Sequence, residues 1–302
     1  MKIATNLCRL GILAALGAVM LLAIALLAFS YVEVGVTDEI GVEMLGLLPC
    51  DLSSVPQSVA EDAVRLTREL AGDSQGKYTD FADQLLASYV KAKDKDFIVV
   101  FNPGGWGWNL AERSSGWNSI LSGIKSELNN LGYSSVMLNY RRTGETMRGA
   151  VKEFIEATID YPFKAKELAL RVEFLTAHIP NLKVIVTGES NGTVISDSTM
   201  CILRDNPNVY SIQTGSPFWH KSVMVERTLL LNDNGMVHDT FSEGDIPAIL
   251  WASLKNLFGQ GPEEANPGKI LYFLRAPGHD YRWQYPDVCS QITGFLERNF
   301  GD

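Results

Sequence analysis

From residue 97 onward, short unbroken apolar runs alternate with longer segments that have helical spacing. Runs of this length that are apolar throughout are typical of parallel strands buried on both faces. Their alternation with helices predicts an α/β fold with a mostly parallel, doubly wound sheet flanked by helices. The expected strands lie in 97–109, 134–142, 182–188, 208–218, 227–232 and 269–275, and the expected helices are 115–133, 161–180, 191–205, 247–259 and 287–300.

The chain before residue 97 has a different character. Residues 58–72 and 78–93 have helical spacing, and 33–55 is a connector whose apolar runs are broken by glycines. A total of 302 residues is enough for one large α/β domain after this region. We therefore expect an N-terminal segment at 1–32, a connector with two helices at 33–94, and the α/β domain at 95–302.

The N-terminal segment is the most apolar part of the chain. From Leu10 to Val32, about 23 consecutive residues carry no charge, and as a helix they reach about 35 Å, enough to cross a hydrocarbon core of about 30 Å. Basic residues precede this run and acidic residues follow it. This predicts a single-pass transmembrane helix with a cytoplasmic N-terminus and an extracytoplasmic domain. A cleaved signal peptide with Ala28 and Ser30 near the cleavage site is the alternative, which leaves the protein secreted or periplasmic.

Charge and composition exclude several kinds of partner and cofactor. The net charge of −9 disfavours nucleic acid, which requires a basic face. The chain has no Cys/His cluster at zinc spacing and no phosphate-binding glycine loop with a lysine. We therefore expect neither a metal nor a cofactor.

One short motif lies at the carboxyl end of an expected strand, where parallel sheets bind their ligands. In "KVIVTGESNGTVIS", a strand runs into Gly-Glu-Ser-Asn-Gly and a helix follows, so Ser190 occupies a tight strand-to-helix turn. Gly188 and Gly192 allow close backbone approach on either side of the serine. The motif predicts Ser190 as a nucleophile, and the alternative is a loop that uses small residues only to turn.

A serine nucleophile requires a base, and the chain has four histidines. His279 follows the last expected strand in "KILYFLRAPGHDYRW", and a loop at that position reaches the strand ends. We therefore favour His279 as the general base. His238, in an earlier loop, is the alternative, while the position of His178 at the end of a helix is explained by the helix dipole.

The acid that orients the base should come from the loop between serine and histidine. This loop, "RTLLLNDNGMVHDTFSEGDIP", contains several acidic residues. We favour Asp239, because it has no evident local role. Asp245 remains an alternative, although it precedes Ile-Pro and a helix and is explained by N-capping. Asp233 lies in a turn-like "NDNG" and is the third candidate.

An oxyanion hole requires backbone N–H groups that point at the developing charge. The N–H of Asn191, directly after the serine, is one expected donor. The turn in "FNPGGWGWN" follows an early strand and supplies the other, from Trp106 or from Gly105. The alternative is a glycine-rich hairpin with a core tryptophan.

Taken in chain order, these features resemble the α/β-hydrolase family over about residues 95–300. The resemblance rests on the GGWG turn, Gly-Glu-Ser-Asn-Gly, the acidic loop and Gly-His after the last strand. It implies Ser190 as nucleophile, His279 as base, an acid near Asp239 and an acyl-enzyme intermediate. Asn102-Pro103 and Glu189 depart from residues that are frequent in the family. The segment 208–218, "NVYSIQTGSPF", is similar to the lipase branch.

These features predict a serine hydrolase that acts on a carboxylic ester, either a small molecule or a lipid. A thioesterase, amidase, peptidase or acyltransferase would use the same groups, and a hydrolase-like domain that binds a lipid or partner without turnover is the non-enzymatic alternative. Segment 143–160 is either a small cap or an ordinary connection. Aromatic residues at strand ends are candidates for an acyl pocket: Trp106, Trp108, Phe218 and Trp219.

Overall fold

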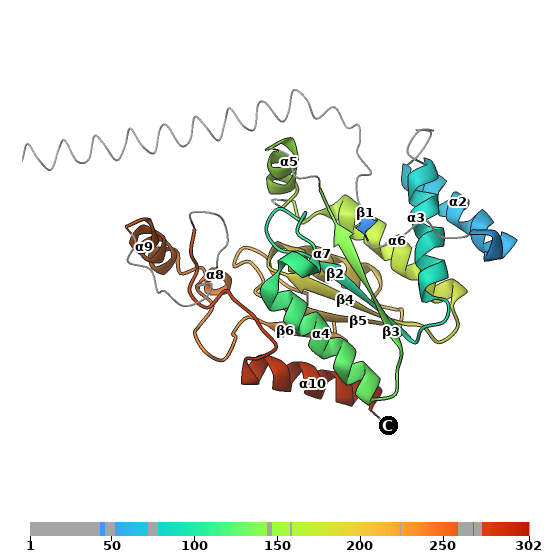
Figure 1. The fold of residues 1–302 in the computed structure, drawn as a ribbon. Coiled ribbons are helices and arrows are strands. Elements are labelled where there is room, and N and C mark those ends of the chain that lie inside the picture. Colours follow the sequence, from blue (N-terminus) through green and yellow to red (C-terminus); the bar gives the residue numbers. More distant parts are fainter. Residues whose placement is uncertain are drawn as a thin grey trace, which may run out of the picture.

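The computed structural model describes residues 43–45, 52–71, 78–143, 147–157, 159–223, 225–258, 268 and 274–301. In this part of the chain, a six-stranded sheet forms the middle layer and helices cover both of its faces (Figure 1). The strands are β1 (Glu43–Leu45), β2 (Phe97–Asn102), β3 (Ser135–Arg141), β4 (Lys183–Glu189), β5 (Val209–Thr214) and β6 (Thr228–Leu231). The α-helices are α2 (Gln57–Ala71), α3 (Tyr78–Ala92), α4 (Ser115–Asn130), α5 (Met147–Ala157), α6 (Pro162–His178), α7 (Asn191–Ile202), α8 (Thr240–Glu243), α9 (Ile246–Leu257) and α10 (Pro286–Phe300), with short 3-10 turns at Leu52–Ser54 and Ala111–Arg113.

The sheet is parallel from β3 to β6, in the spatial order β1-β3-β2-β4-β5-β6. β1 pairs antiparallel with β3 at one edge. Residues 43–45 therefore belong to the sheet, although the sequence placed them in a connector. An antiparallel edge strand on a parallel sheet is a common arrangement in α/β folds.

Alternate residues of the central strands face two separate apolar layers. In β2, Ile98 and Val100 pack with residues of α2, α3, α6 and α7. Phe97, Val99 and Phe101 pack on the opposite face with residues of α4 and α10. All five side chains are buried, so the strand is apolar throughout because both of its faces are covered.

The connections that follow β2 and β4 run to opposite faces of the sheet. The chain leaves β2 toward α4 on one face of the sheet, and leaves β4 toward α7 on the other face. Ligands of open parallel sheets bind where neighbouring connections diverge in this way, at the carboxyl ends of the strands. The Gly-Gly-Trp turn and Ser190 follow these two strands directly.

Most of the expected elements are confirmed, with ends that differ by a few residues. Helix α5 lies in segment 143–160, for which the sequence left a cap and an ordinary connection open. The N-terminal segment 1–32 lies outside the described residues, and so does most of the predicted strand 269–275. Among the helices that the structure describes, none is both long and apolar enough to cross a bilayer.

The start of α7 packs against the ends of β2 and β4 with no room for a side chain. A Cβ atom on Gly192 would lie 2.3 Å from the carbonyl oxygen of Asn102, and one on Gly188 would lie 2.8 Å from the Gly192 carbonyl oxygen. Both neighbours are backbone, so they cannot turn away as a flexible side chain would. Glycine at these two positions is therefore a packing requirement of the fold.

We predict that Gly192→Ala lowers the free energy of unfolding by about 1–3 kcal/mol, because the added methyl forces backbone apart. The matched control is Gly294→Ala in α10, where the nearest atom to the new Cβ is the Arg298 Nη1 at 3.4 Å. This control should gain about 0.5–1 kcal/mol, as a glycine removed from a helix interior does. Urea unfolding of both variants measures the difference, and a Gly192→Ala protein as stable as the control would contradict the packing argument.

Candidate active site

Ser190 lies at the sharp turn between β4 and α7, in a backbone conformation that is unusual for a residue with a side chain. Its φ is 49° and its ψ is −122°. Hydrogen bonds hold the residue on both sides: its N–H donates to Thr214 O at 2.9 Å, and its carbonyl accepts from Thr193 N at 2.8 Å. The hydroxyl does not cap α7. The strained turn therefore leaves the Ser190 side chain without a capping role, as in a strand-to-helix turn that carries a nucleophile.

The turn after β2 packs directly on this serine. A Cβ atom on Gly104 would lie 3.2 Å from Ser190 Cβ. The Gly104 N–H donates to Glu189 Oε2 at 3.2 Å, and Gly107 N–H closes the turn on Gly104 O at 3.2 Å. Within the described residues, the N–H groups of Gly105 and Trp106 have no acceptor.

The predicted oxyanion donors lie in the two turns that pack together at Ser190 and Gly104. Asn191 is the first residue of α7, so its N–H has no acceptor in the helix. Its side chain donates to Gly105 O at 3.3 Å, which joins the two turns. The structure thus links the Asn191 side chain to the carbonyl of Gly105, whereas the Gly104 N–H is already used by Glu189.

His279 reaches the same end of the sheet on a loop that hydrogen bonds tie in place. Thr240 donates from its N–H and its hydroxyl to Pro277 O, at 3.0 and 2.9 Å. Asn234 Nδ2 donates to Gly278 O at 2.9 Å. A Cβ atom on Gly215, the residue after Thr214, would lie 2.7 Å from His279 Cε1, so the ring stands over the end of β5.

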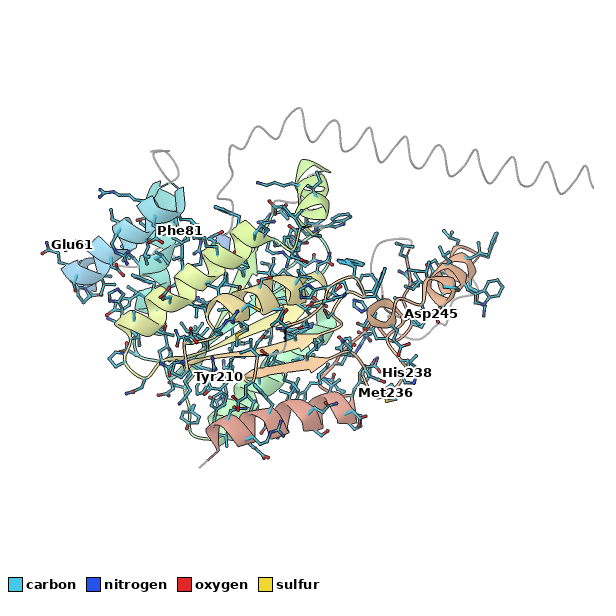
Figure 2. All side chains as sticks on the ribbon, turned by 180° about the vertical axis from the view of Figure 1, so that it is seen from behind. Glu61, Phe81, Tyr210, Met236, His238 and Asp245 are labelled. Atoms are coloured by element: carbon cyan, nitrogen blue, oxygen red, sulfur yellow. The ribbon has the colours of Figure 1, made fainter. Side chains whose placement is uncertain are left out.

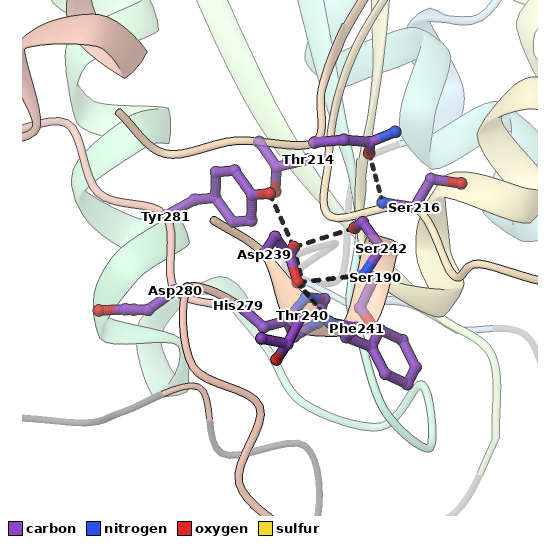
Figure 3. Close-up of polar contacts among 12 residues, drawn as sticks. Ser190, Thr214, Ser216, Asp239, Thr240, Phe241, Ser242, His279, Asp280 and Tyr281 are labelled. Atoms are coloured by element: carbon purple, nitrogen blue, oxygen red, sulfur yellow. Dashed lines mark hydrogen bonds and ion pairs between the residues drawn. The ribbon is translucent and has the colours of Figure 1, made fainter. Parts of the chain in front are cut away.

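Asp239 is the acid that contacts this histidine. The distance from its Oδ2 to His279 Nδ1 is 2.8 Å, and the side chains are 0% and 9% exposed, respectively. The same oxygen accepts the hydroxyls of Tyr281 at 2.8 Å and Ser242 at 2.9 Å, while Oδ1 accepts the N–H of Phe241 at 2.9 Å. Figure 3 draws Ser190 together with the His279–Asp239 pair, and among the residues drawn no hydrogen bond joins Ser190 to His279.

These contacts keep Asp239 ionised. Burial by itself raises the pKa of its carboxyl, but the hydrogen bond and charge of His279 and the Tyr281 hydroxyl lower it more, so the pKa lies below the ordinary value. Tyr281 responds in the opposite direction. Burial and the nearby Asp239 charge raise the pKa of its hydroxyl far above the ordinary value, so it stays a donor.

The other candidates for acid and base lie elsewhere. Asp245 is the N-cap of α9 and accepts from Ala248 N at 3.0 Å. Asp233 pairs with His238 at 3.0 Å, and the His238 ring is 79% exposed. Figure 2 labels His238 and Asp245 at the end of the molecule where α8 and α9 lie. His178 bonds to Asp62 at 2.9 Å at the end of α6.

The aromatic candidates form two groups. Trp106 and Trp108 stack on each other in the turn after β2, with ring centroids 6.1 Å apart. Phe218 and Trp219 both pack edge-on against Phe241, at 6.3 and 5.3 Å. Phe241 in turn contacts the His279 ring at 4.7 Å. The second group is therefore continuous with the candidate base, and Phe218 and Trp219 are each nearly half exposed.

A buried ion pair holds the loop that carries this second group. His220 Nε2 lies 3.1 Å from Asp197 Oδ2 in α7, and its Nδ1 lies 3.4 Å from Asp160 Oδ1. Asp197 also accepts from Ser222 Oγ and Val223 N, both at 2.9 Å. Burial lowers the pKa of His220, but the hydrogen bond and charge of Asp197 outweigh it and raise the pKa above its ordinary value.

Several residues of the site have no signal in the sequence. Tyr281 and Ser242 bind Asp239 but belong to no recognisable motif. Glu189 holds the turn after β2, and although it lies in the Gly-Glu-Ser-Asn-Gly motif, the sequence assigns it no such role. In the described part of the chain, no group of three His, Cys, Asp or Glu side chains lies close enough together to bind a metal ion.

Comparisons with known proteins give likenesses among solved structures alone. No family model matches the chain, and no curated protein matches it. Among solved structures, the chain is similar to Trichoderma reesei cutinase in complex with a C11Y4 phosphonate inhibitor. The match has a TM-score of 0.38 and 12% identity, and covers 82% of this chain and 94% of that chain. At that distance the likeness supports no conclusion about this site.

We predict that the His220 contacts stabilise the fold in a pH-dependent way. Because the folded state raises the pKa of His220, the contribution is complete below the unfolded value of about 6.5 and is lost as the pH rises through the folded value. The loss of unfolding free energy caused by His220→Asn should therefore be larger at pH 5.5 than at pH 8.5. The exposed His238→Asn is the control, and an equal effect of His220→Asn at both pH values would contradict the assignment.

Proposed function

We propose that this protein is a serine hydrolase of the α/β-hydrolase family that cleaves a carboxylic ester. The observation that carries the proposal is the buried contact of 2.8 Å between His279 and Asp239, at the same end of the sheet as a serine in a strained strand-to-helix turn. Buried carboxylate, imidazole and presented hydroxyl are the three groups that acyl transfer through serine requires.

In the proposed reaction, Asp239 accepts from Nδ1–H of His279 and so leaves Nε2 free as the base. Ser190 Oγ attacks the ester carbonyl while His279 takes its proton, and a tetrahedral intermediate forms. His279 then returns the proton to the leaving alcohol, which gives an acyl-enzyme. Water, deprotonated by the same imidazole, attacks the acyl-enzyme and releases the acid, so Ser190 recovers its proton.

The negative oxygen of the intermediate needs donors that exist before the reaction starts. The N–H of Asn191 follows Ser190 directly, and the N–H groups of Gly105 and Trp106 belong to the turn that packs on Ser190 through Gly104. They support this role, since they have no acceptor within the described residues. Donors of this kind stabilise the transition state because they need no reorganisation.

The surroundings of His279 favour an ester with an apolar group. Phe218 and Trp219 are partly exposed and pack on Phe241, which contacts the imidazole. Phe241 also packs with Ile249 of α9. Beyond this contact, α9 and the residue after it expose a row of large apolar side chains: Ile246, Leu250, Trp251, Leu254, Leu257 and Phe258. An apolar surface next to the site suits acyl chains longer than acetyl.

We expect each of the three substitutions Ser190→Ala, His279→Ala and Asp239→Asn to lower kcat on p-nitrophenyl esters by about 10³-fold or more. Asp239→Asn preserves the shape of the site but lets the amide select the wrong imidazole tautomer. Asp245→Asn and Asp233→Asn are the matched controls, and both should keep kcat within a few-fold of the wild type.

A fluorophosphonate probe tests the nucleophile without knowledge of the substrate. The wild type should be labelled on Ser190, and Ser190→Ala should not be labelled. A folded wild type that remains unlabelled beside a reactive control hydrolase would mean that the domain binds without turnover. Comparison of oxygen esters, thioesters and amides of one acyl group then separates an esterase from the other acyl-transfer activities.

The aromatic contacts of Phe218 and Trp219 lead to a further prediction. Phe218→Ala combined with Trp219→Ala should lower the kcat/KM ratio of decanoate to acetate esters by about 10-fold, equivalent to about 1.4 kcal/mol of lost apolar contact. Ile202→Ala, which removes an exposed apolar side chain in α7, should leave the ratio unchanged. An unchanged ratio in the double variant would place the acyl chain elsewhere.

A further inference from the structure

The turn at residues 103–107 is held by one buried arginine. Arg142 follows β3, and its guanidinium donates to Pro103 O and, at 3.5 Å, to Gly105 O. Its backbone N–H donates to Gly107 O at 2.8 Å. A Cβ atom on Gly107 would lie 2.7 Å from Arg142 Nε, so the guanidinium packs directly on the backbone of the turn. The arginine thus contacts three of the five residues of this turn.

Arg142 is itself held by an ion pair from a different element. Glu153 of α5 accepts from Arg142 Nε and Nη2, both at 2.8 Å, and the side chains are 1% and 0% exposed. The second oxygen of Glu153 binds Lys164 Nζ of α6 at 2.6 Å, and Lys164 also pairs with Glu156. Burial lowers the pKa of Arg142, but the Glu153 charge raises it more, so the pair stays charged.

The serine turn holds the opposite side of the same segment. Glu189 accepts the Gly104 N–H at 3.2 Å and the Ser114 hydroxyl at 3.1 Å. Asn191 Nδ2 donates to Gly105 O at 3.3 Å. The turn is therefore fastened at its carbonyl groups and at the Gly104 N–H, and these contacts leave the N–H groups of Gly105 and Trp106 without acceptors among the described residues.

Stability alone is a weak explanation for this buried network. Desolvation of two charges opposes folding, and apolar side chains of similar volume often stabilise a fold as well as a buried ion pair does. What an arginine adds is geometry, since its planar donors fix several carbonyl groups at once. Arg142 uses those donors on Pro103, Gly105 and Glu153.

We propose that Arg142, oriented by Glu153, is a positioning residue that fixes the 103–107 turn so that its free N–H groups face the oxygen on which charge develops when Ser190 attacks. This inference rests on the proposed function and extends it to segment 143–160. Helix α5 in that segment supplies Glu153, so the segment helps to hold the turn through Arg142.

The proposal has a kinetic signature. Oxyanion donors act on the transition state more than on the bound substrate, so a displaced turn lowers kcat and leaves KM nearly unchanged. It also weakens the binding of a tetrahedral boronic acid analogue, which needs the same donors. Loss of one such donor typically costs about 10²–10³-fold in kcat.

The test uses the double variant Arg142→Met with Glu153→Leu in the full chain. It removes both charges together, so neither is left buried and unpaired, and Lys164 keeps Glu156. The matched control is Arg171→Met with Glu167→Leu, which removes another buried pair, at 2.6 Å within α6. That pair contacts Gln84 and Tyr140 but does not contact the 103–107 turn.

Three measurements are made on each protein: steady-state kinetics with inhibition by a boronic acid, amide hydrogen exchange in a peptide that covers the turn, and urea unfolding. We expect the Arg142/Glu153 variant to lose about 10²-fold in kcat and in boronate affinity at similar KM, with faster exchange in the turn and an unchanged urea midpoint. The control should match the wild type in kcat, boronate affinity and turn exchange.

The outcomes separate the inference from the proposed function. If exchange in the turn is unchanged in the Arg142/Glu153 variant, or if kcat falls equally in the control, the positioning role is wrong. If the variant simply unfolds, the single substitution Arg142→Lys keeps the charge but loses the planar fork, and the role requires that it too lose kcat. A wild type that reacts with neither probe nor ester overturns the proposed function, and turn exchange still shows whether Arg142 holds these amides.

Discussion

The site depends on how closely α7 approaches the ends of β2 and β4. Glycines at 188 and 192 let backbone touch backbone there, and this contact forces the chain through a positive φ at Ser190. Such a conformation costs about 1–3 kcal/mol and persists only where neighbours enforce it. Here the Thr214 carbonyl and the Thr193 N–H hold the residue on both sides. The strain is thus a consequence of helix-on-sheet packing, and the hydroxyl takes no part in capping α7.

Around this serine, polar contacts fix groups that come from distant parts of the chain. Asp239 joins the loop after β6 to the loop before α10, since it caps α8 and binds His279 and Tyr281 at the same time. Arg142 and Glu153 do the same for the turn after β2. In both cases a buried charge is satisfied on every side, which keeps it ionised and keeps its partners in one geometry.

The sequence predicts those parts of the candidate site that depend on local patterns of residues. Ser190 was predicted from its strand–turn–helix context, and the structure bears out that context at β4 and α7. The sequence favours Asp239 because it has no evident local role, yet the structure makes it the N-cap of α8 as well as the partner of His279. The premise was therefore wrong although the contact exists. One carboxylate has two oxygens, and each takes a different task.

What the sequence by itself determined is the alternation of buried strands and helices, and with it the end of the sheet where the candidate residues gather. Period and composition carry that information, because a strand covered on both faces must be apolar at every position. The tertiary structure alone decided that Asp239 is the acid in contact with His279. It alone also decided that Arg142 donates hydrogen bonds to the 103–107 turn. Those contacts join residues about 40 positions apart, and the geometry of the loops between them depends on packing against the whole sheet rather than on local sequence.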